Sequence, residues 1–233
     1  MDGIGLRRFE RKNGKSESDG DMKKNEPHAE ALRILSAADE KLAEIIAEVG
    51  PCKLRIHTPG KTDAHEFFES LVESIVSQQL SVKASDTIYK RVLALGGGKL
   101  LGPKELAAVP DETLRGAGLS GQKVRYVRDL CLKVADGSVN LTNLETLDDE
   151  EVIERLRLVK GIGRWTAEMF LMFRLGRPDV LPVQDLGIQQ GMKKLYKMRE
   201  VPTAEKMEKV AKKWRPYRSI ACWYLWRVHE KMK

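Results

Sequence analysis

The stretch 158–167, LVKGIGRWTA, constrains the fold of this chain more than any other segment. Just before it, residues 150–158 place apolar side chains at the spacing of one helix face. Gly161 and Gly163 then interrupt the pattern, because glycine accepts a positive φ and lets another backbone approach closely. An apolar helical pattern resumes over residues 164–173. The sequence therefore predicts two helices joined by a tight Gly-x-Gly hairpin.

Such a hairpin offers a site for an anion. The N–H groups that open its second helix lack partners within the helix and lie at the positive end of the helix dipole. Lys160, Arg164 and Thr166 add side-chain donors around the same point. An ordinary helical turn ended by glycine is the competing interpretation of Gly161 and Gly163.

Helical spacing also governs the rest of the chain, and no β-alternation of useful length appears. We therefore expect an all-α fold. Residues 1–26 are charged and poor in large apolar groups, which predicts a disordered arm. The other expected helices are 29–49, closed by Gly50-Pro51, one capped by Asp63, 82–95, two short ones opened by Pro103 and Pro110, and one capped by Ser120 that ends near Gly137.

The charge of the chain is unevenly distributed. The net charge of the 233 residues is +7, which favours polyanionic partners. Residues 160–233 hold 17 Lys/Arg against 7 Asp/Glu, whereas residues 1–159 hold 24 against 27. We interpret the run 206–213 as a solvated surface. The excess around the hairpin is better explained by a partner such as DNA.

The cysteines and histidines exclude several kinds of site. Cys52, Cys131 and Cys222 lie far apart without a CxxC pair, and the four histidines are scattered. This argues against a disulfide framework and against a zinc site. The sequence has no apolar run of membrane-spanning length and no signal peptide. We expect a soluble, intracellular protein.

A single carboxylate follows the hairpin at a position suited to chemistry. Asp185, in LPVQDLGIQQ, ends a Pro-containing loop where another helix begins. It offers a base or an electrostatic partner. Asp more commonly serves there only to cap the helix, and the two roles are compatible.

LVKGIGRWTA and LPVQDLGIQQG together resemble the helix-hairpin-helix and Gly-Pro-Asp region of the DNA glycosylase superfamily, in particular its 3-methyladenine DNA glycosylase II (AlkA/Mag) family. Segments 67–92, 114–131 and 214–227 resemble further helices of that family in the same order. The resemblance implies two helical subdomains with the active-site cleft between them and the hairpin on its rim, one of residues 62–157 and one of 27–61 plus 158–233. It is to the compact form, without the β-rich N-terminal domain of some bacterial members.

The resemblance also implies an activity. It is that of a monofunctional glycosylase that flips alkylated purines, chiefly 3-methyladenine and 7-methylguanine, out of double-stranded DNA and hydrolyses the N-glycosidic bond. Asp185 matches the catalytic carboxylate. Trp165 stands where bifunctional branches carry a nucleophilic Lys, so no lyase activity is expected. Trp165 and Trp226 match walls of the base pocket, and Met169 replaces a Tyr of the bacterial type.

Other matched positions would hold DNA and an ion. Gln79 occupies the position of the intercalating wedge, with Leu80 as its neighbouring alternative. A turn that joins two helices through side-chain amides is the competing interpretation. Ser120 and Lys123 resemble a second backbone-gripping hairpin, for which a helix cap is the alternative. The main-chain carbonyls of Arg157, Val159 and Ile162 would bind a structural Na⁺ or K⁺, and no other cofactor is required.

Two classes of function remain at the level of sequence. The first is the glycosylase, acting as a monomer in the cytoplasm or nucleoid of a prokaryote or in a eukaryotic nucleus. The second is a DNA-binding module without catalysis, since helix-hairpin-helix elements also serve as sequence-neutral clamps. Asp185 and Trp226 discriminate between them, because a clamp needs neither. Uracil and hypoxanthine stay open as minor substrates.

Overall fold

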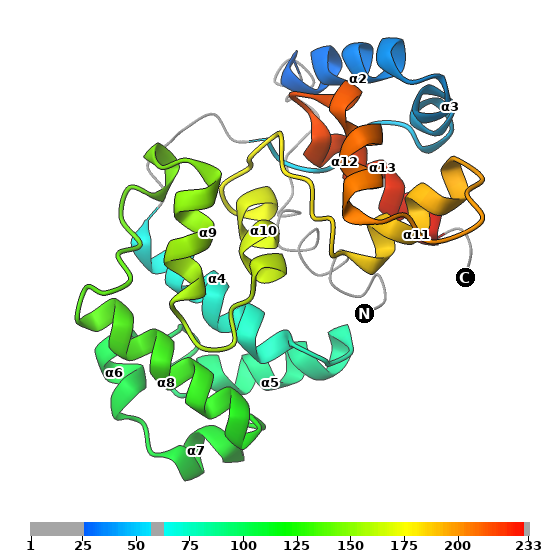
Figure 1. Cartoon of the computed structure of the whole chain (residues 1–233). Coiled ribbons are helices and arrows are strands. Elements are labelled where there is room, and N and C mark those ends of the chain that lie inside the picture. The colour runs from blue at the N-terminus through cyan, green and yellow to red at the C-terminus, as the bar shows by residue number, and fades with distance from the viewer. Residues whose placement is uncertain (1–25, 57–62, 231–233) are drawn as a thin grey trace. The chain divides into compact units, whose positions relative to one another are not determined.

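The computed structural model describes residues 26–56 and 63–230, and every helix or strand element that it defines there is a helix (Figure 1). The all-α prediction is confirmed. The expected arm lies outside the described residues except for Glu26, which opens the first helix. In the described ranges no helix has the length and apolarity needed to cross a membrane.

The chain divides into two compact units. Unit 1 combines its two ends, residues 1–58 and 171–233, and unit 2 is the continuous segment 59–170. The division places residues 158–170, which carry the hairpin, with the middle of the chain, whereas the resemblance groups them with the C-terminal part.

The helices of unit 2 begin at residues that the sequence marks as caps. Asp63 accepts a hydrogen bond from the His65 N–H, and Ser120 accepts one from the Lys123 N–H. Asp148 and Glu151 form a reciprocal capping box. The helices are α4 (Ala64–Ser77), α5 (Val82–Ala94), α6 (Pro103–Ala108), α7 (Asp111–Gly116), α8 (Gly121–Ala135), the 3₁₀ turn η2 (Leu144–Thr146), α9 (Asp149–Arg157) and the start of α10 (Arg164–Phe173).

Unit 1 is assembled around a buried C-terminal helix. Its elements are α2 (Glu26–Ala38), α3 (Glu40–Val49), the end of α10, α11 (Leu186–Leu195), α12 (Ala204–Ala211), the 3₁₀ turn η3 (Lys212–Trp214) and α13 (Arg218–Glu230). Every residue of α13 from Ser219 to Trp226 is buried. Such all-round burial explains why this helix carries apolar side chains on every face.

One expected helix is in fact two. Instead of a continuous helix over residues 29–49, the chain breaks at Asp39, whose backbone is extended (φ −149°, ψ 100°) and whose side chain caps α3. The Asp39 carboxylate is 3% exposed and accepts hydrogen bonds from the Trp214 indole (2.9 Å), the Lys213 ammonium (3.0 Å) and the Tyr196 hydroxyl. These partners lie more than 150 residues away in the chain, so apolar spacing within 29–49 does not reveal the break.

Candidate functional site

The predicted hairpin is present and occupies residues 158–163, between α9 and α10. The Ile162 N–H donates to the Val159 carbonyl (3.1 Å), which closes the turn. Gly161 has φ +85°, and a methyl group there would lie 2.2 Å from a ring carbon of Tyr126, so this position demands glycine twice over. A methyl group at Gly163 would meet nothing within 4 Å. The packing of the protein therefore does not explain Gly163, whereas close approach of an outside backbone would.

Helix α8 holds the hairpin in shape. Asp129 accepts hydrogen bonds from the Lys160 N–H and from the Lys133 ammonium, both at 2.8 Å, and Lys133 also donates to the Leu158 carbonyl. Burial by itself would raise the pKa of Asp129, but the hydrogen bonds and positive charges of Lys133 and Lys160 bring that pKa below its ordinary value. Contacts within the protein thus hold the hairpin, and the N–H groups of Lys160 and Ile162 already donate inside it.

The predicted side-chain donors differ in how accessible they are. The Lys160 side chain is 74% exposed. Arg164 is instead held by two acidic residues, with its guanidinium paired to both oxygens of Glu150 and its Nε donating to Glu168 at 3.1 Å. Thr166 is buried. Among these three residues, Lys160 therefore presents its charge most openly.

The second predicted hairpin makes contacts within the protein. Ser120 caps α8, as the competing interpretation holds, and the Lys123 ammonium donates to the Val76 carbonyl at the end of α4 (2.7 Å). DNA contact by Ser120 and Lys123 stays a prediction.

The predicted wedge lies in the turn between α4 and α5. Gln79 is exposed and has φ +57°, a left-handed conformation that non-glycine residues seldom adopt. Leu80 is half-buried. The side-chain amide of the preceding residue, Gln78, donates to the Gly161 carbonyl at 2.8 Å. The amide of this turn therefore contacts the hairpin, a link that the sequence alone does not indicate.

The predicted catalytic carboxylate lies at the N-terminus of α11. Asp185 is 8% exposed, and its Oδ1 accepts hydrogen bonds from the Ile188 N–H and from the Trp226 indole N–H, both at 2.8 Å. The helix-capping role is therefore present. An additional donor from α13 fixes the orientation of the carboxylate, which capping alone would not require.

Trp226, a predicted pocket residue, contacts Asp185 within unit 1. Its ring is 4% exposed and stacks on Phe173, with ring centroids 5.9 Å apart. Trp165 is half-buried and Met169 is buried, and both belong to unit 2. Their approach to Trp226 stays a prediction.

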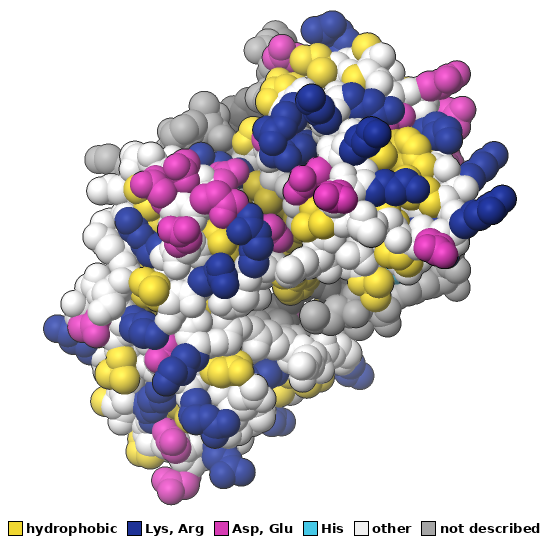
Figure 2. Space-filling view, in the orientation of Figure 1, with side chains coloured by type: hydrophobic (Ala, Val, Ile, Leu, Met, Phe, Trp, Pro, Cys, Tyr) yellow, Lys and Arg dark blue, Asp and Glu magenta, His cyan; other side chains and the backbone are white. Residues whose placement is uncertain are grey.

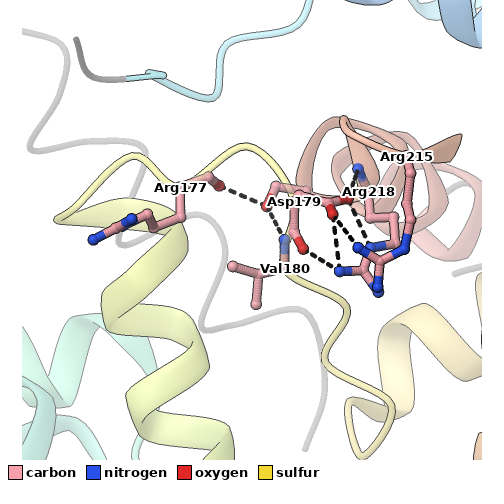
Figure 3. A network of polar contacts seen from close by, with 6 residues as sticks. Arg177, Asp179, Val180, Arg215 and Arg218 are labelled. Carbon is pink, nitrogen blue, oxygen red and sulfur yellow. Dashed lines mark hydrogen bonds and ion pairs between the residues drawn. The ribbon is translucent and has the colours of Figure 1, made fainter. Parts of the chain in front are cut away.

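Sequence reasoning missed a network that anchors the loop leading to Asp185 (Figure 3). Asp179 accepts hydrogen bonds from Arg218 Nε (2.7 Å) and from Arg215 (2.8 Å). Ser219 donates to the Arg177 carbonyl at 2.7 Å and accepts from the Val180 N–H at 2.9 Å. The loop is thus tied to the start of α13 here and to its last turns through Asp185 and Trp226. The sequence hints at this network only through the Arg-x-x-Arg-Ser string of residues 215–219, which does not indicate that the loop before Asp185 supplies the partners.

Surface charge in unit 2 is segregated. Acidic side chains gather over α9, whereas Lys and Arg dominate over α8 (Figure 2). Helix α8 contains Lys123, Arg125, Arg128 and Lys133 against a single acidic residue, Asp129. Of these residues, Lys133 and Asp129 contact the hairpin, whereas Arg128 pairs with Asp111.

The ion predicted at the hairpin would be held by main-chain oxygens. Among the described residues, no group of His, Cys, Asp and Glu could hold a metal ion. The carbonyl groups of Arg157, Val159 and Ile162 are neutral donors in and beside a tight turn. Neutral carbonyl oxygens suit a monovalent cation, so the residues present fit the predicted ion.

Comparison with known proteins agrees with this geometry. The HhH-GPD superfamily of base excision DNA repair proteins matches residues 72–216. DNA-3-methyladenine glycosylase 1 of Schizosaccharomyces pombe is 34% identical over 197 residues, covering 83% of this chain and 84% of that protein. The fold of this chain matches that of a DNA-3-methyladenine glycosidase from Bacillus halodurans, with 43% identity and a TM-score of 0.73 over 87% of this chain and 90% of that one. It also matches a Schizosaccharomyces pombe 3-methyladenine DNA glycosylase in complex with abasic DNA (33%, TM-score 0.72, 85% and 95%). The chain therefore belongs to the HhH-GPD superfamily of base excision DNA repair proteins, and within it to the 3-methyladenine DNA glycosylase family.

Proposed function

We propose that the protein is a monofunctional DNA glycosylase that removes alkylated purines, chiefly 3-methyladenine and 7-methylguanine, from double-stranded DNA. The observation that carries this proposal is the Asp185 carboxylate, buried and oriented by two donors at a helix N-terminus. A protein that only gripped DNA would need no such group. The 3-methyladenine enzymes to which the chain is similar support 3-methyladenine as a substrate, and 7-methylguanine follows from the family resemblance alone.

The reaction breaks the bond between C1′ of the deoxyribose and the purine nitrogen. The electron pair of that bond leaves with the base, and positive charge develops on the sugar in an oxocarbenium-like transition state. The Asp185 carboxylate stabilises this charge and orients water, whose oxygen bonds to C1′ and whose proton is released. An alkylated purine already carries positive charge, so it leaves as a neutral base without a strong general acid. One carboxylate is then sufficient.

Position 165, the second residue after the hairpin, determines whether the DNA strand is also cut. A lyase requires an amine that attacks C1′ and forms a Schiff base. Trp165 stands at that position, and its indole nitrogen is not such a nucleophile. Its ring is instead suited to stacking on a cationic base, together with Trp226 and beside Met169.

The hairpin would hold the DNA backbone. The N-terminal end of α10, the open space at Gly163 and the exposed Lys160 ammonium suit a phosphate. The carbonyls of Arg157, Val159 and Ile162 would bind Na⁺ or K⁺, which supplies positive charge beside that phosphate. Gln79 would enter the duplex in place of the extruded nucleotide. Because genomic DNA is the substrate, the site of action is inside the cell.

The decisive experiment replaces Asp185 by Asn, which keeps the shape of the side chain but removes its charge. We expect base release from methylated duplex DNA to fall at least about 100-fold, the scale of losing one electrostatic contact to a transition state. Affinity for DNA containing a neutral abasic-site analogue should stay close to that of the wild type. Strand nicking should be undetectable with either protein.

Two outcomes would contradict the proposal. An Asp185→Asn protein that releases methylated bases at the wild-type rate would remove the catalytic role of Asp185. A wild-type protein that binds DNA but releases no base from a panel of damaged duplexes would favour the non-catalytic DNA-binding module.

A further inference from the structure

Gln78 connects the turn between α4 and α5 to the hairpin of residues 158–163. It is the last residue before the predicted wedge, and its amide crosses to the Gly161 carbonyl (2.8 Å), 83 residues further along the chain. Both elements lie in unit 2. The hydrogen bond therefore connects the turn that presents Gln79 directly to the hairpin that would hold the DNA backbone.

The turn that carries Gln79 is strained and is held by two hydrogen bonds to residues that precede Gln79. A left-handed, non-glycine residue such as Gln79 is strained and persists only where its surroundings impose that conformation. Two such constraints are present. Gln78 is held by Gly161, and Lys123 donates to the Val76 carbonyl at the end of α4.

The hairpin end of this link is equally well defined. Gly161 lies against the Tyr126 ring, and its neighbour Lys160 donates its N–H to Asp129. Tyr126, Asp129, Lys133 and Lys123 recur at intervals of three to four residues and so share one face of α8. One helix face thus supports both the turn and the hairpin.

We propose that Gln78 is a positioning residue that fixes the wedge relative to the hairpin, so that gripping a phosphate places Gln79 at the base stack. This inference rests on the proposed function for the role of Gln79. Without the Gln78 hydrogen bond, the hairpin still binds the backbone, but the turn is free to relax from its left-handed conformation. Affinity for DNA and insertion of the wedge then become separable.

The test uses the full chain carrying Gln78→Met, which keeps the length of the side chain and removes the donor. The probe is a duplex with a neutral tetrahydrofuran abasic site and 2-aminopurine beside it, because 2-aminopurine brightens when a wedge unstacks it. Affinity for undamaged duplex is measured in parallel by fluorescence anisotropy. Gln122→Met is the matched control, since Gln122 is an exposed residue of α8 whose amide donates to the Tyr126 hydroxyl and not to the hairpin.

We expect Gln78→Met to bind undamaged duplex like the wild type. The equilibrium constant for wedge insertion should fall about 2- to 10-fold, as expected for one neutral hydrogen bond. Gln79→Gly should abolish the brightening, and adding Gln78→Met to it should cause no further loss. Gln122→Met should match the wild type in both assays.

Three results would overturn the inference: a wild type that does not brighten the probe, a Gln78→Met protein that brightens it fully, or one that loses affinity and brightening in equal proportion. Should Gln78→Met fail to fold, Gln78→Asn keeps the amide but is one methylene too short, and the same split is expected. The brightening requires no base release. A wedge that works in a protein without glycosylase activity would therefore contradict the proposed function and leave this inference standing.

Discussion

Trp226 combines a predicted role in the base pocket with an observed hydrogen bond to Asp185. The resemblance assigns it to the wall of the base pocket, and the structure shows its N–H donating to Asp185 Oδ1 at 2.8 Å. Hydrogen bonds to an ionised acceptor are among the stronger ones in proteins. The orientation of the predicted catalytic carboxylate therefore depends on an indole that is itself stacked on Phe173.

Trp226→Phe keeps an aromatic ring but removes the donor. We expect single-turnover base release to fall about 10- to 100-fold, as for loss of a hydrogen bond to a charged group. Trp223→Phe is the matched control, because Trp223 is equally buried on the same helix but lies under the Arg227 guanidinium and meets the Tyr224 ring edge-to-face. It should retain the wild-type rate.

A second measurement separates this effect from base stacking. DNA carrying a cationic pyrrolidine in place of the sugar mimics the charge of the transition state and contains no base. Trp226→Phe should lose its preference for this analogue over neutral tetrahydrofuran DNA. An unchanged preference would show that Trp226 acts only on the base.

Single residues also mark where sequence reasoning stops. The match of Asp185 and the need for glycine at Gly161 are readable from local pattern. The ion-pair partner of Arg164 cannot be predicted in this way, because Glu150 lies on another helix and is one of several acidic residues there. The sequence likewise does not indicate that the Lys123 ammonium donates to the Val76 carbonyl, which lies 47 residues earlier in the chain.

Among the elements, α11 and α13 pack unusually closely. A methyl group at Gly191 would lie 2.2 Å from the Leu225 carbonyl oxygen, and one at Gly187 would lie 2.8 Å from a ring carbon of Trp226. The two glycines lie four residues apart and therefore share one face of α11. This glycine face lets Trp226 reach the carboxylate at the start of the helix.

Gly191→Ala should therefore destabilise the protein. The obstacle is backbone rather than a flexible side chain, so we expect a loss of about 1–3 kcal/mol in the free energy of unfolding. Gly116→Ala is the control, since a methyl group there meets nothing within 4 Å and φ is not positive. Urea unfolding should give Gly116→Ala a stability equal to or above the wild type. If Gly191→Ala were as stable as Gly116→Ala, α11 and α13 would be able to move apart without loss of stability, which would contradict this prediction.

Most helix starts could be predicted, because a cap is a local signal. Asp63, Ser120 and Asp185 each cap the helix that the sequence places after them. The break at Asp39 could not, because its partners come from the other end of the chain. Local pattern thus predicts helices well and misses breaks that distant contacts stabilise.

At the scale of the whole molecule, Asp39 is where the N-terminal helices meet the C-terminal half of unit 1. Burial alone would raise its pKa, but hydrogen bonds from Tyr196, Trp214 and Lys213 bring that pKa below the ordinary value of 3.8. The stability that this carboxylate contributes is present above pH 3.8 and is lost as the pH falls through its lower native pKa.

Asp39→Asn tests this dependence. At pH 7 we expect the variant to be less stable by about 1.5–3 kcal/mol, as for hydrogen bonds to a charged group. The gap between the two proteins should narrow below about pH 4. Asp129 titrates with a lowered pKa in both proteins, so its contribution cancels in the difference. A gap that stays constant down to pH 2 would contradict the assignment.

Unit 1 is made from both ends of the chain, while unit 2 is one uninterrupted segment. During synthesis on the ribosome, unit 2 is complete once residue 170 has emerged, and it can fold then. Helices α2 and α3 can pack only later, because Asp39 and the Gly50 carbonyl accept hydrogen bonds from Trp214 and Tyr224, which are synthesised near the end of the chain. A nascent chain would thus contain the hairpin and the predicted wedge well before it contains Asp185. If those assignments hold, a truncated product could bind DNA without hydrolysing a glycosidic bond.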